Sequence, residues 1–194
     1  MTGPRVVVAY GIGSAHDLLR AEAARLHHVA VERIVLGHEC DRCGSDDHGR
    51  PRLLPTASVR HPAHVSLARA GDLSVVALTA AGPVGIDVEA TDAAGFTGFD
   101  DVALHADESV RTAAERTRLW VRKEALLKAY GLGLAVDPRD VLIDDGTVTW
   151  DSPLRPPGTV RLLDVDVPGH VSAVAVVTDA GPGGLSVTVR AASS

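Results

Sequence analysis

The sequence has few aromatic residues, few cysteines and almost no lysine. Aromatic residues make up 3% of its 194 residues, so valine, leucine and alanine must fill any core. The two cysteines, Cys40 and Cys43, are too few and too close together for a disulfide framework. No apolar run approaches the roughly 20 residues of a membrane-spanning helix. These absences argue against a disulfide-stapled domain and against an integral membrane protein.

A surplus of basic residues is also absent. The net charge is -6 and no basic stripe is visible, which argues against nucleic acid as the main partner. Near the N-terminus, Arg5 precedes only a short apolar run, from Val6 to Tyr10, so we expect no secretory signal. We therefore expect a cytoplasmic protein.

The apolar content of 45% is sufficient for a substantial core, in one domain or in two small ones. Short β-branched runs ended by glycine predict strands, and apolar residues near helical spacing predict helices. The predicted helices are 15–30, 107–116 and 118–130. The predicted strands are 6–10, a pair within 65–79 that turns at Gly71, 84–89, a pair within 136–150 that turns at Asp145-Gly146, 160–163 and 171–177.

Each half of the chain has its predicted helices first and its strands last. A weak similarity supports this repetition, because His64 to Ser66 resembles His170 to Ser172. The stretch 90–100 is rich in small residues and is expected to join two units. The pattern predicts an α+β fold of two similar α+β subdomains packed face to face, with boundaries 1–92 and 93–194.

The only two lysines, Lys123 and Lys128, lie in one predicted helix that ends at Gly131. Apolar side chains cover nearly its whole circumference, which predicts a buried helix. Glu124 and Lys128 are four residues apart and so lie on one face. They form either a surface salt bridge or part of a reactive site, because buried charges are costly unless paired or bound to an ion. The absence of lysine elsewhere favours the reactive site, since a lysine pKa can be tuned for proton transfer.

Two carboxylates lie two residues apart on the predicted strand 84–89. Asp87 and Glu89 therefore point to one face, whereas Ile86 and Val88 point to the other. Such a pair is commonly solvated at a surface. Alternatively, it is half of a site for a hard cation, since Mg²⁺ favours carboxylate oxygens, waters and phosphates.

The polar stretch from His38 to Pro51 is predicted to be a loop. It holds Cys40, Cys43 and His48, whose side chains are of the types that bind zinc. Zinc usually takes four ligands, and no second Cys-x2-Cys pair is present. The loop is therefore either a structural zinc site or a turn with reduced thiols.

Two motifs carry a resemblance to a known family. The first is Gly85-Ile86-Asp87-x-Glu89, and the second, about thirty residues later, is Trp120-x-x-Lys123-Glu124-x-x-x-Lys128 with Gly131-x-Gly133-Leu134. In this order and separation they resemble the 4′-phosphopantetheinyl transferase superfamily. The length and the mid-chain position of Asp87 resemble its larger, pseudo-dimeric Sfp-type branch, which implies a monomer.

The resemblance implies a Mg²⁺-dependent transfer of the 4′-phosphopantetheine arm of coenzyme A to a serine of a carrier protein domain, releasing 3′,5′-ADP. The carrier would be an acyl, peptidyl or polyketide carrier domain. Asp87, Glu89 and Glu124 match the family's metal ligands. Glu124 also matches the position proposed to deprotonate the serine, and Lys128 matches the lysine near the leaving phosphate. With Asp87, these two residues are the catalytic group that the resemblance implies.

The resemblance also implies residues that bind the coenzyme. His48 and Arg50 lie in a segment similar to the family's Gly-Lys-Pro, and Lys123 and Lys128 are assigned to phosphate. Arg69 replaces a histidine, and the residue before it, Ala68, replaces a serine, at the family's site for the 3′-phosphate. Arginine binds phosphate well, but a hydroxyl is lost. An alternative is therefore a weakened member that binds coenzyme A or carrier domains without efficient turnover.

Overall fold

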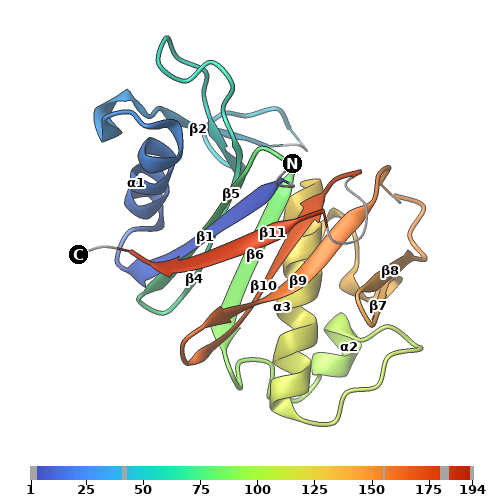
Figure 1. The fold of residues 1–194 in the computed structure, drawn as a ribbon. Helices are drawn as coiled ribbons and strands as arrows, with labels where there is room; N and C mark the ends of the chain where they lie inside the picture. Colours follow the sequence, from blue (N-terminus) through green and yellow to red (C-terminus); the bar gives the residue numbers. More distant parts are fainter. Residues whose placement is uncertain (1–3, 41–42, 155, 180–183, 193–194) are drawn as a thin grey trace.

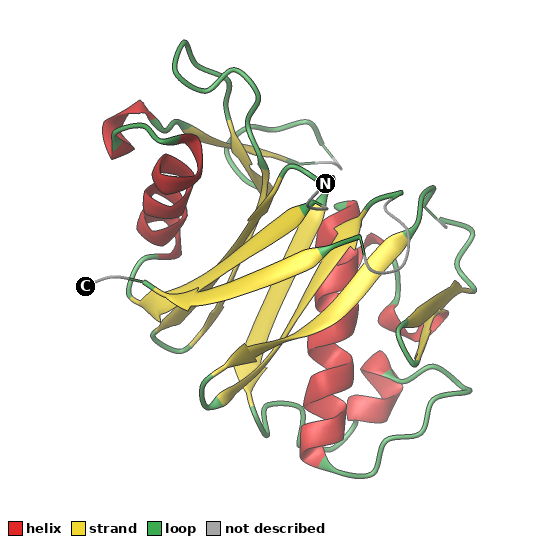
Figure 2. Cartoon of the chain, viewed as in Figure 1, coloured by secondary structure: helices red, strands yellow, loops and turns green. Residues whose placement is uncertain are grey.

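The computed structural model describes residues 4–40, 43–154, 156–179 and 184–192. Two sheets face each other, and each carries a helix on its outer face (Figures 1 and 2). The helices are α1 (Ala15–His27), α2 (Phe99–Ala103) and α3 (Ala113–Tyr130), with 3₁₀ turns η1 (Val31–Arg33), η2 (Gly133–Ala135) and η3 (Pro138–Asp140). The strands are β1 (Arg5–Ile12), β2 (Leu36–Glu39), β3 (Arg50–Leu53), β4 (His64–Ala70), β5 (Leu73–Thr79), β6 (Val84–Ala90), β7 (Val141–Asp144), β8 (Thr147–Trp150), β9 (Val160–Val167), β10 (His170–Val177) and β11 (Ser186–Ala191).

The predicted α+β class is confirmed by this mixture of packed helices and sheets. Among the described residues, no helix has the length and apolar character needed to cross a membrane.

The first sheet has the strand order β11-β1-β5-β4. β1 runs antiparallel to β5 and parallel to β11, so Val8 lies opposite both Ala77 and Val189. Because alternate residues of a strand point to opposite faces, Val8 enters the core between the sheets while Ala9 packs in the cluster that contains α1. Figure 1 shows β11, the last strand of the chain, lying beside the first.

The second sheet has the strand order β6-β10-β9, and α3 covers its outer face. Ala173 and Ala175 of β10 lie in the same buried cluster as Ala125 of α3, so small side chains allow a close contact. Arg122 of α3 donates two hydrogen bonds, of 2.7 and 2.9 Å, to the Asp164 carboxylate of β9. This bidentate pair fixes the helix along the sheet.

The two sheets repeat one topology. The unit β1-α1-β4-β5 has the sheet order β1-β5-β4, and the unit β6-α3-β9-β10 has the order β6-β10-β9. In this correspondence β4 matches β9, whereas the sequence similarity joins His64 of β4 to His170 of β10, so that similarity does not follow the structural repeat. The second unit begins with β6, which precedes the expected boundary at residue 92, and β11 returns to the first sheet.

The helix predicted for residues 107–116 is wrong. The segment before residue 113 is irregular, and one continuous helix begins at Ala113. Thr112 accepts a hydrogen bond from the Glu115 backbone N–H, and the Glu115 carboxylate accepts one from Thr112, which forms a capping box. The helix ends as predicted at Gly131, whose φ of 70° suits glycine.

The loop predicted from His38 to Pro51 is shorter than expected. Its two ends form the antiparallel pair β2-β3, in which Glu39 lies opposite Arg50. The hairpin predicted at Asp145-Gly146 is confirmed, with positive φ at both residues as a type I′ turn requires.

Gly85 allows α3 to lie directly on β6. A Cβ atom at this position would stand 2.0 Å from the Ala125 carbonyl oxygen and 2.5 Å from the Ala129 nitrogen, both backbone atoms of the helix. The helix therefore cannot make room without moving as a whole. Since Lys128 belongs to the same turn, Gly85 sets how close this lysine comes to β6.

We expect Gly85→Ala to separate α3 from β6 and to lower the free energy of unfolding by about 1–3 kcal/mol or more, as overpacking does. Urea unfolding measures this loss. Gly37→Ala is the matched control, because the three atoms nearest to a Cβ there all belong to the side chain of Leu54, which is 40% exposed and able to move. Equal stability of the two variants would contradict the proposed role of Gly85.

Candidate active site

The centre of the candidate site is an ion pair between α3 and β6. The Lys128 ammonium lies 2.6 Å from Asp87 Oδ1 and 3.3 Å from the Ile86 carbonyl oxygen. These two contacts use two of the three N–H donors of a lysine. The Lys128 side chain is 32% exposed, so its remaining donor is accessible to a ligand.

Asp87 is held in an unfavourable environment. It is 6% exposed, and its second oxygen, Oδ2, is buried without a hydrogen-bond partner among the described residues. Burial raises the pKa of Asp87, and the neighbouring Lys128 only partly offsets this effect. A buried carboxylate oxygen without a partner is costly, and a bound cation would satisfy it.

Glu89 and Glu124 share this environment. Burial raises the pKa of Glu89, and the negative charge of Asp87 raises it further. Burial likewise raises the pKa of Glu124, and Asp87 and Glu89 add to the effect. In both cases Lys128 acts in the opposite direction. The three carboxylates predicted from sequence are therefore near enough to repel one another. Lys128 acts against the rise in pKa of all three.

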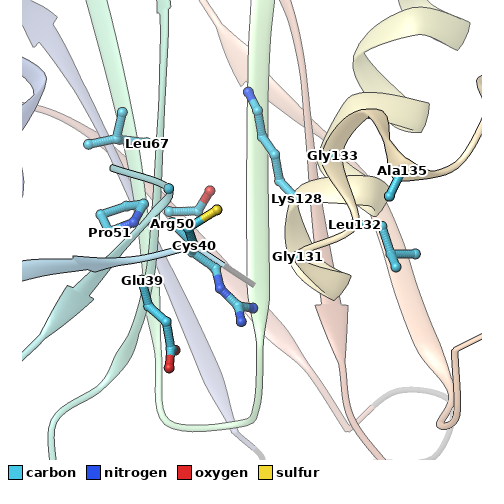
Figure 3. Close-up of a pocket in the computed structure, with 12 residues that line it drawn as sticks. Glu39, Cys40, Arg50, Pro51, Leu67, Lys128, Gly131, Leu132, Gly133 and Ala135 are labelled. Carbon is cyan, nitrogen blue, oxygen red and sulfur yellow. The ribbon is translucent and has the colours of Figure 1, made fainter. Parts of the chain in front are cut away.

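A cavity of about 560 Å³ lies beside Lys128. Figure 3 shows Pro51 and Leu67 on one side of the cavity and Lys128 and Leu132 on the other, the side of α3. Lys128 thus joins the carboxylates to the cavity. The lining residues are Glu39, Cys40, Gly49, Arg50, Pro51, Ser66, Leu67, Lys128, Gly131, Leu132, Gly133 and Ala135.

Of the five residues predicted to bind the coenzyme, Arg50 and Lys128 line the cavity. Arg50 also donates a hydrogen bond of 3.5 Å to the Ala129 carbonyl oxygen, so it connects β3 to α3. Arg69 is exposed and donates to the Gly71 carbonyl oxygen, and neither it nor His48 lines this cavity.

The structure corrects the assignment of Lys123 to phosphate binding. Its side chain is fully buried, and its three donors are taken by Glu108, at 2.6 Å, and by the carbonyl oxygens of Ala103 and Pro138. Burial lowers its pKa and Glu108 acts against that shift. Lys123 is therefore a structural residue that links α3 to the segments around it, and it has no donor left for a ligand.

Sequence reasoning missed several cavity residues. Glu39, Ser66 and Ala135 line the cavity but belong to no recognised motif, and Leu132 occupies the unspecified position of the Gly131-x-Gly133 motif. Ser66 Oγ also accepts a hydrogen bond of 3.1 Å from the Ile86 backbone N–H, which joins β4 to β6 next to Asp87. One signal in the sequence could have identified Ser66. It lies two residues before Ala68, so both residues share one face of a strand.

Comparison with known proteins gives the class. The sequence model of the 4′-phosphopantetheinyl transferase superfamily (ACPS) matches residues 83–173, which include β6, α3 and the acidic residues around Lys128. Over this segment, which is somewhat less than half of the chain, the protein is similar to the 4′-phosphopantetheinyl transferase superfamily, and the similarity implies a transferase. No curated protein matches the chain significantly.

Members of this superfamily act on carrier proteins with coenzyme A and use Mg²⁺. The residues here fit such a cation, because Asp87 Oδ2 is buried without a partner and two further carboxylates lie in its field. As a set, however, the oxygens of Asp87, Glu89 and Glu124 are not all within 4.8 Å of one another. Mutual repulsion favours this wider spacing.

The contrast between the two lysines is testable. We expect Lys123→Met to lower the free energy of unfolding by about 3–5 kcal/mol, because Glu108 keeps a buried charge without its partner. Coenzyme A binding by the folded fraction should not change. Lys128→Met, the control in the same helix, should weaken coenzyme A binding. Urea unfolding and calorimetric titration measure the two effects. Weakened binding by folded Lys123→Met would contradict the purely structural role of Lys123.

The crowded carboxylates predict that neutralising one of them stabilises the protein. The folded state raises the pKa of Glu89 and so disfavours its ionised form. In the absence of divalent cations we expect Glu89→Gln to raise Tm by no more than about 2 °C, because solvent screens the repulsion at this partly exposed side chain. Its increase in Tm on adding Mg²⁺ should be smaller than that of the wild type.

Glu32→Gln, at an exposed glutamate in η1, is the control and should leave Tm and its Mg²⁺ response unchanged. Thermal unfolding with and without Mg²⁺ gives both values. A lower Tm for Glu89→Gln without metal would show that the ionised carboxylate is stabilising.

Proposed function

We propose that the protein transfers the 4′-phosphopantetheine arm of coenzyme A to a serine of a carrier protein domain, in the presence of Mg²⁺. The observation that carries this proposal is the position of Lys128, which lines the cavity and also bonds Asp87. A phosphate in the cavity would meet a lysine donor whose other contacts hold it next to three carboxylates.

In the proposed reaction the serine hydroxyl oxygen attacks the phosphorus that carries the pantetheine arm. The bond from that phosphorus to the bridging oxygen breaks, and 3′,5′-ADP leaves. Glu124 takes the serine proton, and its raised pKa suits this role because a base acts best when its pKa approaches the working pH. Lys128 donates to the developing negative charge on the leaving phosphate.

Asp87, Glu89 and Glu124 are the residues proposed to hold Mg²⁺. When bound, the ion supplies neutralisation of the pyrophosphate charge. Without the ion, the positive charge of Lys128 offsets part of the cost of burying the Asp87 carboxylate.

The cavity is proposed to hold part of coenzyme A. Arg50 provides a guanidinium for an anionic group, and Leu67 and Leu132 provide apolar surface. The repeated unit within one chain supports the Sfp-type branch and a monomer, since both sheets of the pseudo-dimer come from the same molecule.

One observation favours the alternative function of a binding protein with weak turnover. Ala68 is buried in the core between the sheets and Arg69 is exposed outside the cavity lining. The 3′-phosphate of the coenzyme would therefore meet only Arg69 at this position. Coenzyme A binding without transfer to any carrier would support this alternative.

The proposed function predicts transfer of a labelled pantetheine arm from coenzyme A to apo carrier domains. We expect Asp87→Ala to lower the rate at least about 100-fold, because it removes a metal ligand and a partner of Lys128. Arg50→Gln should weaken coenzyme A binding about 10-fold or more, the effect of losing one charged hydrogen bond.

Arg60→Gln, at an exposed arginine outside the cavity, is the control for Arg50→Gln. The assay uses a panel of fatty-acid, polyketide and peptide carrier domains with Mg²⁺ present. Absence of transfer to every member of the panel would contradict the proposed reaction.

A further inference from the structure

A second group of potential metal ligands lies outside the acidic site. Cys40, Cys43 and His48 place one ligand atom each within 4.8 Å of the others. Within this group the Cys43 sulfur is 3.5 Å from His48 Nε2. All three residues lie in the connection between β2 and β3. None of them takes part in the proposed transfer reaction.

The spacing agrees with zinc. In a tetrahedral site, Zn–S bonds of about 2.3 Å and Zn–N bonds of about 2.0–2.1 Å place a sulfur and a nitrogen about 3.5 Å apart. The Cys43–His48 separation has this value. Thiolate and imidazole ligands select zinc over Mg²⁺, whereas the carboxylates near Lys128 have the opposite preference. The ligand types of the two groups therefore favour different metals.

Backbone hydrogen bonds within the β2-β3 connection bring these three side chains close together without a metal. The Cys40 N–H donates to the Ser45 carbonyl oxygen at 2.9 Å, and the Gly44 N–H donates to the Cys40 carbonyl oxygen at 2.8 Å. Gly49 has a φ of 104°, and a Cβ there would stand 2.4 Å from the Glu39 carbonyl oxygen. Glycine at this position lets the segment that carries His48 lie against Cys40.

We propose that Cys40, Cys43 and His48 bind a Zn²⁺ ion through two thiolates and one imidazole, with water in the fourth position. The two thiolates balance the charge of the ion. The site closes the open end of the β2-β3 hairpin, directly beyond the Glu39–Arg50 pair.

The zinc site bears on the cavity through this hairpin. Cys40, Gly49 and Arg50 all line the cavity, and Arg50 follows His48 by two residues. A metal that fixes Cys40 to His48 reduces the conformational freedom of Arg50 before a ligand binds. Resting on the proposed function, this makes zinc a positioning element for coenzyme A binding.

The test begins with metal analysis of the full chain purified under reducing conditions without chelator. We expect stoichiometric zinc, and after exchange with Co²⁺ we expect the absorption bands of tetrahedral thiolate ligation. Cys43→Ser and His48→Ala should lose the bound metal. His61→Ala, at an exposed histidine outside the cluster, should retain it. Circular dichroism of each variant checks that it is folded.

A second measurement follows coenzyme A binding by calorimetry before and after zinc removal with a chelator. We expect weaker binding without zinc and recovery when zinc is restored. Protein without zinc that also fails to develop the Co²⁺ bands overturns the site, as does retention of zinc by both ligand variants. A Cys40–Cys43 disulfide that survives reducing purification would also overturn the proposed zinc site. Zinc content is measured without coenzyme A, so a failure of the transferase proposal leaves this result intact.

Discussion

The contact between α3 and β6 is the constraint on which the site depends. Gly85 has no side chain, and the helix backbone occupies the space that a Cβ would fill. This closeness allows the Lys128 ammonium to reach both Asp87 Oδ1 and the Ile86 carbonyl oxygen. It also places Glu124, one helical turn away, within the electrostatic field of Asp87 and Glu89. A wider separation would leave three acidic residues without a common partner.

The two lysines of α3 show how hydrogen-bond saturation separates a structural from a reactive charge. Both lie on one helix and both contact a carboxylate. Lys123 is fully buried and gives all three donors to the protein, so its charge is satisfied internally. Lys128 is partly exposed, lines the cavity and has two protein contacts, which leaves one donor for a ligand. Helical spacing alone does not distinguish these two outcomes.

Local patterns predicted much of the fold and of the site. Periodicity places Asp87 and Glu89 on one face of a strand and Glu124 and Lys128 on one face of a helix, and the family resemblance brings the two pairs together. In the structure these carboxylates and Lys128 lie in one another's electrostatic field, while the roles assigned to them stay predictions. Non-local contacts were not predictable in this way. The pairing of β11 with β1 joins opposite ends of the chain, and the partner of Lys123, Glu108, lies in an irregular segment that was predicted to be helical. The capping box at Thr112 was a local signal that had been missed.

The cavity combines parts of both repeated units, and this has a consequence for how the site forms. Arg50 and Leu67 come from the part of the chain that builds the first sheet, whereas Lys128 and Leu132 come from α3 and the segment after it. Ser66 and Ile86 link β4 to β6 by a hydrogen bond at the junction. Because β11 returns to the first sheet after the second is complete, the first sheet needs chain from both sides of the junction. The carboxylates and the cavity therefore come together only in the fully folded chain, and neither repeated unit contains the site alone.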